Sequence, residues 1–187
     1  MSDRMQIVLN AIDAANAVDP KTDEGQPEAL LYGERMSAEL AERLPDASEL
    51  LQIAARGQHV ERWKLPRSAY PEGRAGYLAW RKAQAVHHAE VIAKMMMAAG
   101  YEAPEVDAVG RMLRKEGIKR DTEVQALEDV ICLVFLKWYF APFAAKHTPE
   151  KIQRIVEKTA RKMSAEGRAL VLAEFELPDH LSKAFAD

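Results

Sequence analysis

The sequence has a single cysteine, Cys132, and lacks an apolar run long enough to cross a membrane. A lone cysteine excludes an internal disulfide, and "MSDRMQIVLN" interrupts its apolar residues with charge and Asn, unlike a signal peptide. The most apolar segment, "VICLVFLKWYFAPFAA", contains Lys137 and is shorter than the roughly twenty apolar residues that a bilayer requires. We therefore expect a protein of the reducing cytoplasm without a membrane span.

The sequence also has no excess of positive charge. It contains 26 Lys and Arg against 29 Asp and Glu, for a net charge of −3. General nucleic-acid binders carry a strongly basic face, so this balance argues against bulk nucleic-acid binding. A chain of 187 residues that is 48% hydrophobic has enough apolar residues for one well-buried core. We expect a single domain, and the composition leaves oligomerisation open.

No β-type alternation, repeat or low-complexity tract is present, whereas apolar residues recur at helical spacing along most of the chain. We predict an all-α fold of about seven or eight helices. The signals indicate helices ending before Asp19, starting at Pro27, starting at a capping box of Asp46 and Glu49, spanning about 76–99 and 104–116, capped by Asp121 or Thr122, and starting at Thr148. The helix after residue 121 is apolar on every side from Val130 to Phe140, which predicts a central position.

One stretch, at about 57–75, has no sustained period. It includes "RWKLPRSAYPEG", whose two prolines predict a long ordered loop, and long loops in compact domains are often functional. Residues 56–82 contain seven basic side chains against two acidic ones, interleaved with aromatic rings. Arginine and aromatic groups suit a ring-bearing anion such as a nucleotide. The predicted substrate-binding residues are Arg56, Arg62, Arg67, Arg74, Tyr77, Trp80 and Arg81. The alternative is a solvated loop whose aromatic residues anchor it to the core.

Several ionisable side chains fall on apolar stripes. His88 shares a helix face with Val91 and Ile92, whereas His87 lies about 100° around the helix. Imidazole and carboxylate groups from several helices are a ligand set for zinc, iron or manganese. The candidate metal ligands are Glu34, His59, His88, Glu116 and Asp129. Each could instead be structural, with the histidines hydrogen-bonded and the carboxylates paired with Lys or Arg.

The runs "AARGQHVERW", "GRAGYLAWR", "HHAE", "LRKEG" and "LEDVICLVFL" resemble the family known as domain of unknown function 4202. The resemblance extends from "IDAAN" to "KMS", over most of the chain. No biochemical role is attached to that family, so the resemblance implies no activity.

The order of the polar residues is more distantly similar to the HD superfamily of helical metal-dependent phosphohydrolases. That resemblance implies an HD-like fold, with Glu34 in place of the first His, Gln58-His59 in place of the His-Asp doublet, and His88, Glu116 and Asp129 as later ligands. The doublet itself is missing, and two His positions are Glu. A mixed His and carboxylate set would then bind the metal, or catalysis would be lost.

The sequence thus favours an HD-like, metal-dependent hydrolase of a small anionic, phosphorylated or nucleotide-like substrate. In this hypothesis a divalent Mn, Fe or Zn ion activates water, with Glu34, His59 and Asp129 as catalytic residues. Paired irons with oxygenase activity are a variant of it. The alternative is a non-catalytic module on a degenerate HD-like scaffold that binds a nucleotide, an RNA end or another anion. A third hypothesis is an interaction protein that uses Met95, Met96 and Met97 as an adaptable apolar surface.

Overall fold

A computed structural model describes residues 2–186 and confirms the all-α class. The chain forms two compact units, residues 1–116 and 117–187. The described elements of the first unit are α1 (Asp3–Asn16), β1 (Thr22–Asp23), β2 (Gln26–Pro27), α2 (Glu28–Arg43), α3 (Glu49–Arg56), two 3-10 turns (Arg62–Lys64 and Arg67–Ala69), α4 (Gly73–Ala98) and α5 (Ala103–Arg114). Those of the second are α6 (Thr122–Val134), a π-helical turn (Phe135–Tyr139), α7 (Phe140–Ala144), α8 (Pro149–Lys162), α9 (Ala165–Glu174), α10 (Asp179–Ser182) and a 3-10 turn (Lys183–Phe185).

Capping side chains explain where most of the helices begin. Asp121 accepts hydrogen bonds from the backbone of Glu123 and Val124 at the start of α6, and Thr148 caps α8, both as the sequence predicted. The expected capping box of Asp46 and Glu49 is wrong. Ser48 caps α3 instead, because it directly precedes the first helical residue and its hydroxyl accepts from the Leu51 N–H.

The described residues also include one short hairpin that the sequence pattern did not indicate. Thr22 and Asp23 pair in antiparallel register with Pro27 and Gln26. Gly25 has φ +79 at the turn, a value that favours glycine. Such a short hairpin is below the length that hydrophobic alternation can reveal.

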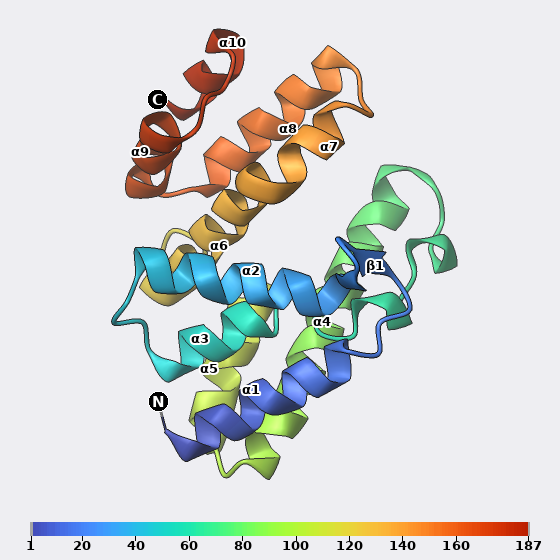
Figure 1. The fold of residues 1–187 in the computed structure, drawn as a ribbon, viewed down its shortest axis with the longest axis vertical. Coiled ribbons are helices and arrows are strands. Elements are labelled where there is room, and N and C mark those ends of the chain that lie inside the picture. Colours follow the sequence, from blue (N-terminus) through green and yellow to red (C-terminus); the bar gives the residue numbers. More distant parts are fainter. Residues whose placement is uncertain (1, 187) are drawn as a thin grey trace. The chain divides into compact units, whose positions relative to one another are not determined.

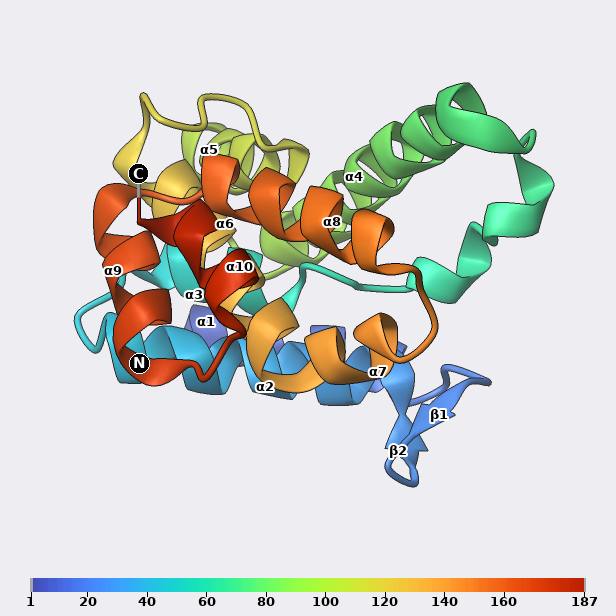
Figure 2. The ribbon, with the colours of Figure 1, turned by 90° about the horizontal axis from the view of Figure 1, so that it is seen from above.

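The core of the first unit is built from α1 to α5. Val8, Ile12, Met36 and Ile53 are among its fully buried side chains, and α4 packs most extensively on α5. Figure 2 shows the segment between α3 and α4 running out beside α4 and turning back at its N-terminal end. This segment, the predicted loop, is ordered and contains the two 3-10 turns.

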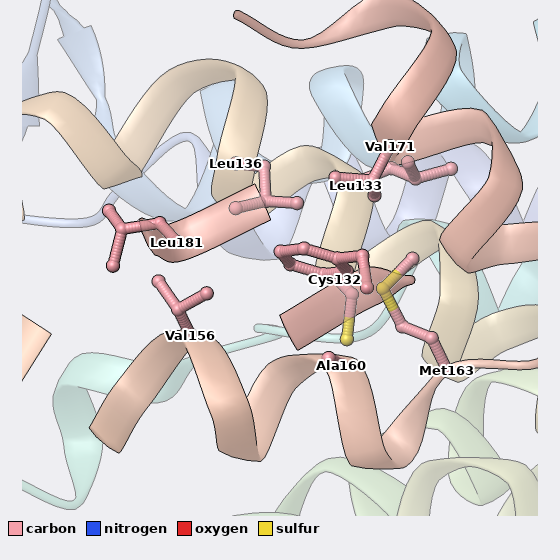
Figure 3. Packing of buried hydrophobic residues seen from close by; sticks show 9 residues of the cluster. Cys132, Leu133, Leu136, Val156, Ala160, Met163, Val171 and Leu181 are labelled. Atoms are coloured by element: carbon pink, nitrogen blue, oxygen red, sulfur yellow. The ribbon is translucent and has the colours of Figure 1, made fainter. Parts of the chain in front are cut away.

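The second unit has its own apolar cluster. Leu133 and Leu136 meet Val156, Met163 and Val171 from later helices, and Figure 3 shows these side chains converging. In Figure 1 the chain runs from α6 through α7 into α8 and closes with α9 and α10. Among the described residues no helix is both long and apolar enough to pass through a membrane.

Candidate functional site

The segment 57–65 lies along one face of α4, and side chains on that face hold its backbone. The Trp80 indole N–H donates to the Leu65 carbonyl at 2.8 Å, and the Gln84 amide donates to the carbonyls of Arg62 and Leu65, both at 2.9 Å. His88 Nδ1 lies 2.8 Å from the Val60 carbonyl. These three α4 residues are four apart, so they share one face, and we call them the α4 ladder.

The start of this segment is fixed by close packing and by Asn16. A Cβ at Gly57 would lie 2.6 Å from Ile92 Cδ1, one turn beyond His88, so a larger residue there would displace the buried Ile92 side chain. Asn16 is buried, and its Oδ1 accepts from the Glu61 N–H at 3.0 Å while Glu61 takes the left-handed φ of 51. A non-glycine residue with positive φ is a local strain that the surrounding contacts must hold. The polar cluster that ends α3 is therefore the anchored beginning of the loop.

His59 and His88 are brought together by this arrangement. Their ring centroids are 6.2 Å apart, and the His59 ring stacks on Tyr32 with centroids 3.6 Å apart at 16°. Because a carbonyl accepts from Nδ1, His88 carries its proton there, which leaves the Nε2 lone pair as an acceptor. That Nε2 atom is buried, and none of residues 2–186 gives it a hydrogen bond.

Burial and nearby cations keep both imidazoles neutral. Burial, followed by the Arg62 charge, lowers the pKa of His88 to about 3. Burial also lowers the pKa of His59 well below its usual value, with Arg62, His88, Lys115 and Arg81 acting in the same direction. The sequence analysis did not single out Lys115. It has φ 60 and ends α5, a local geometry with no signal in the sequence pattern.

Arg62 is the cation at the centre of this group. Its guanidinium carbon lies 4.7 Å from the centre of the Trp80 ring, a cation–π contact. Burial, with the neighbouring Arg81, lowers the pKa of Arg62, which remains a cation. Within residues 2–186, no carboxylate oxygen lies within 4.0 Å of its guanidinium nitrogens. Glu28 acts on Arg62 only at longer range and in the opposite direction, raising its pKa. Arg62 is thus a half-buried positive charge that no carboxylate of residues 2–186 contacts directly.

The other predicted substrate-binding residues are placed differently from one another. Arg56 is engaged by Asp13, with Nε to Oδ1 at 2.6 Å and Nη2 to Oδ2 at 2.8 Å. Arg67 donates to the backbone carbonyl of Tyr70. Arg74 is exposed, and Arg81 lies 5.9 Å from the centre of the Tyr77 ring. Arg62 and Arg81 are therefore the two arginines near the histidines.

The predicted carboxylate ligands have arginine or backbone partners. Glu34 is 44% exposed with Arg56 Nη2 at 3.9 Å, and Glu116 accepts from Arg114 at 2.8 and 3.1 Å. Asp129, in the second unit, accepts from the Ser164 N–H and the Gln125 amide, each at 2.9 Å. The expected place of Glu116 on an apolar helix face is wrong, because α5 ends at Arg114 and Lys115 turns the chain outward. Within the described part of the chain, no three His, Cys, Asp or Glu side chains form a group able to hold a metal ion.

The family of this chain is shown by its sequence. A family model described as "Domain of unknown function (DUF4202)" matches residues 6–184. The chain belongs to this family. No curated protein and no solved structure matches it significantly. The DUF4202 match includes residues of both compact units, so both units belong to the sequence region that defines the family.

Proposed function

We propose that this DUF4202 protein binds a small phosphorylated, nucleotide-like anion beside Arg62 in its first unit. The observation that carries the proposal is the Arg62 guanidinium, held half-buried against Trp80 with no carboxylate of the described residues within 4.0 Å. A buried charge is costly unless it is compensated, and phosphate is the group that matches a guanidinium fork best. Binding without turnover is the simplest function that these contacts support.

Neighbouring residues support an anionic and not a cationic ligand. Arg62, Lys115 and Arg81 all lower the pKa of His59, so a positive potential surrounds the ring. Arg56, in contrast, has its charge balanced by Asp13. Tyr32 and His59 stack on each other beside Arg62, and aromatic groups of this kind also pack on heterocyclic rings.

A thermal-shift panel tests this proposal. Inorganic phosphate and nucleoside monophosphates should raise the Tm in a salt-sensitive way, because a ligand at 100 times its Kd stabilises the folded state by about 2.7 kcal/mol. Arg62→Met should abolish most of the shift, whereas Arg154→Met, which removes an exposed α8 arginine, should retain it. A panel in which no phosphorylated compound shifts the Tm would refute the proposal.

A metal-dependent, HD-like hydrolase is the second candidate, and the His88 Nε2 lone pair favours it. A carbonyl on Nδ1 with Nε2 left as acceptor is the usual arrangement of a metal-binding imidazole, and His59 is the nearest second ligand. The fit is incomplete because, among residues 2–186, no third His, Cys, Asp or Glu completes the set. For that reason we place it second and derive no reaction step from it.

Metal content separates the two candidates. A hydrolase of this kind would retain near-stoichiometric Mn, Fe or Zn after reconstitution, and His59→Ala or His88→Ala would remove it. His87→Ala is the matched control, because His87 is on a different side of α4 from His88. Its Nε2 lies 3.7 Å from Glu61 Oε2. If elemental analysis finds no metal in the reconstituted protein, the hydrolase candidate is excluded and anion binding is unaffected.

A further inference from the structure

The buried face of α4 presents more acceptors than the chain satisfies. On this face and on the segment beside it, three buried acceptor atoms have no hydrogen-bond partner among residues 2–186, namely Gln58 Oε1, Gln84 Oε1 and His88 Nε2, while His87 Nε2 on another side of α4 also has none. The three side chains are 2–7% exposed. A buried acceptor without a donor is unfavourable, so three in one region indicate a group that the chain itself does not supply.

Two of these acceptors lie on α4 and the third on the segment bound to it, and we call the three together the acceptor strip. Gln84 and His88 are one helical turn apart on the α4 ladder. Gln58 lies between Gly57, which is packed against Ile92, and Val60, whose carbonyl is bound by His88, so its backbone runs beside the same face. On α4 the Gln84 amide N–H groups and the His88 Nδ1–H are already used by the carbonyls of Val60, Arg62 and Leu65, so these two side chains offer only acceptors. A molecule that satisfies them must bring N–H or O–H donors.

The same strip adjoins Arg62 and the stacked rings. Gln84 binds the Arg62 carbonyl, and the His88 and His59 centroids are 6.2 Å apart. A ligand that fits all three features carries a negative group for the guanidinium, a flat ring for the Tyr32–His59 pair and a donor for the acceptors. We propose that the ligand is a nucleoside monophosphate with an exocyclic amine, as in adenine or cytosine, whose N–H groups donate to this acceptor strip.

This inference rests on the proposed function, since it specifies the ligand of the same site. It also explains why the strip lacks carboxylates. A carboxylate would bind an amine equally well, but it would neutralise Arg62 and repel the phosphate. Amide and neutral imidazole acceptors recognise the amine without cancelling the positive charge.

Titration calorimetry with matched ligands tests whether the protein recognises the exocyclic amine. Adenosine monophosphate is compared with purine riboside monophosphate, which lacks only the 6-amino group, and with its N6,N6-dimethyl derivative, which lacks only the N–H donors. A second pair is cytidine monophosphate and its analogue without the 4-amino group. At least one amine-bearing nucleotide should bind tenfold or more tightly than its analogues, a factor that corresponds to about 1.4 kcal/mol.

Variants link that preference to the strip. Gln58→Met removes one acceptor with little change of size, and it should fold at least as stably as the parent because that acceptor has no partner. The amine preference is the ratio of the affinity of an amine-bearing nucleotide to that of its analogue. It should fall at least threefold in Gln58→Met or in folded His88→Phe, while phosphate still binds. An undiminished preference in both variants would overturn the assignment to this strip.

The outcomes also separate the two proposals. If phosphate and all the nucleotides bind but the amine pairs differ by less than twofold, the amine inference is wrong and anion binding stands. If inorganic phosphate binds as tightly as the nucleotides, the ring and the amine are not recognised, which is also against the inference. Absence of any binding would end both.

Discussion

The two ring nitrogens of His88 have different environments, because Nδ1 is hydrogen-bonded and Nε2 has no partner among residues 2–186. Its Nδ1 holds the Val60 carbonyl, and burial lowers its pKa to about 3. In the unfolded chain the same imidazole titrates near 6.5. Between these two values the unfolded state binds a proton that the folded state does not.

That difference predicts acid lability. Because the folded-state pKa is depressed, His88 favours the folded state fully above about pH 6.5, and this stability is lost as the pH falls toward about 3. The free energy of unfolding should drop by about 1.4 kcal/mol for each pH unit below about 6.5 through His88 alone. His59, whose pKa is also lowered, adds in the same direction.

Urea unfolding of parent, His88→Gln and His180→Gln between pH 7 and pH 5 measures the effect. The slope of the free energy of unfolding against pH should be smaller in His88→Gln than in the parent, by roughly 1 kcal/mol per pH unit. His180 is exposed, and its substitution should leave the slope as it is. An unchanged slope in His88→Gln would mean that the imidazole titrates normally in the folded protein.

Asp129 gives a second prediction for a single residue. Its Oδ1 accepts from the Ser164 N–H just before α9, and its carboxyl carbon would lie 2.9 Å from a Cβ at Gly167. Asp129→Asn retains an oxygen acceptor and should cost less than about 1 kcal/mol, whereas Asp129→Ala should cost about 1–2 kcal/mol. Chemical denaturation of both variants decides this. Equal, large losses would show that the charge and not the hydrogen bond is essential.

These residues also show what the sequence can predict of a site. The helical period correctly predicted that His88 is buried and that His87 is less so. It could not show that Glu34 lies beside Arg56, which is far away in the sequence, nor that Glu116, just past the end of α5, pairs with Arg114. Tyr32 and Gln84 were missed as site residues, although the four-residue spacing of Trp80, Gln84 and His88 was a usable signal.

Among the elements, the connection between α3 and α4 depends on one glycine. A Cβ at Gly76 would lie 1.8 Å from the Pro71 carbonyl oxygen, so the loop folds back onto the first turn of α4 only if residue 76 is glycine. Backbone cannot move away as a flexible side chain can. The loop therefore depends on Gly76 at one end and on the α4 ladder at the other.

Gly76→Ala should release this turn. We expect a loss of about 1–3 kcal/mol, with faster trypsin cleavage at Lys64 and Arg67. Gly110→Ala is the matched control in α5, since its Cβ would meet only the movable end of Arg114, and alanine there should be neutral or stabilising. Identical cleavage of Gly76→Ala and the parent would contradict this view of the loop.

The helices were mostly predictable because their signals are local. Apolar spacing and the caps at Asp121 and Thr148 lie within a few residues of the turns they define. The two-residue strands and the end of α5 at Lys115 were not predictable, because they depend on single backbone conformations. The ordered loop at 57–75 was recognised, but its attachment to α4 requires contacts 15 to 28 residues apart.

At the scale of the whole molecule, the stability of the second unit can be measured by itself through its cysteine. Cys132, the only cysteine, is 4% exposed within the apolar cluster of the second unit. Its reaction with a thiol reagent should be at least roughly a hundredfold slower in native protein than in denaturant, since it requires opening of that cluster. A rate in native buffer close to the denatured rate would show that the cluster is open.

A ligand bound in the first unit that changes the rate of the Cys132 reaction would show that the two units are energetically coupled. The helical spacing of the apolar residues predicted an all-α chain, and the structure confirms that class. Length and composition predicted a single domain. Division into two compact units at residue 116 had no composition signal, because neither a Pro-rich nor a Gly-rich linker marks it.

The central claim is that Arg62 binds the phosphate of a small ligand. Titration calorimetry of adenosine monophosphate at two salt concentrations, with parent, Arg62→Met and Arg154→Met, tests it most directly. We predict saturable binding that weakens with salt, an affinity at least tenfold lower in Arg62→Met, and no change in Arg154→Met. Equal affinity in the parent and Arg62→Met, or no binding to the parent at all, would contradict the claim.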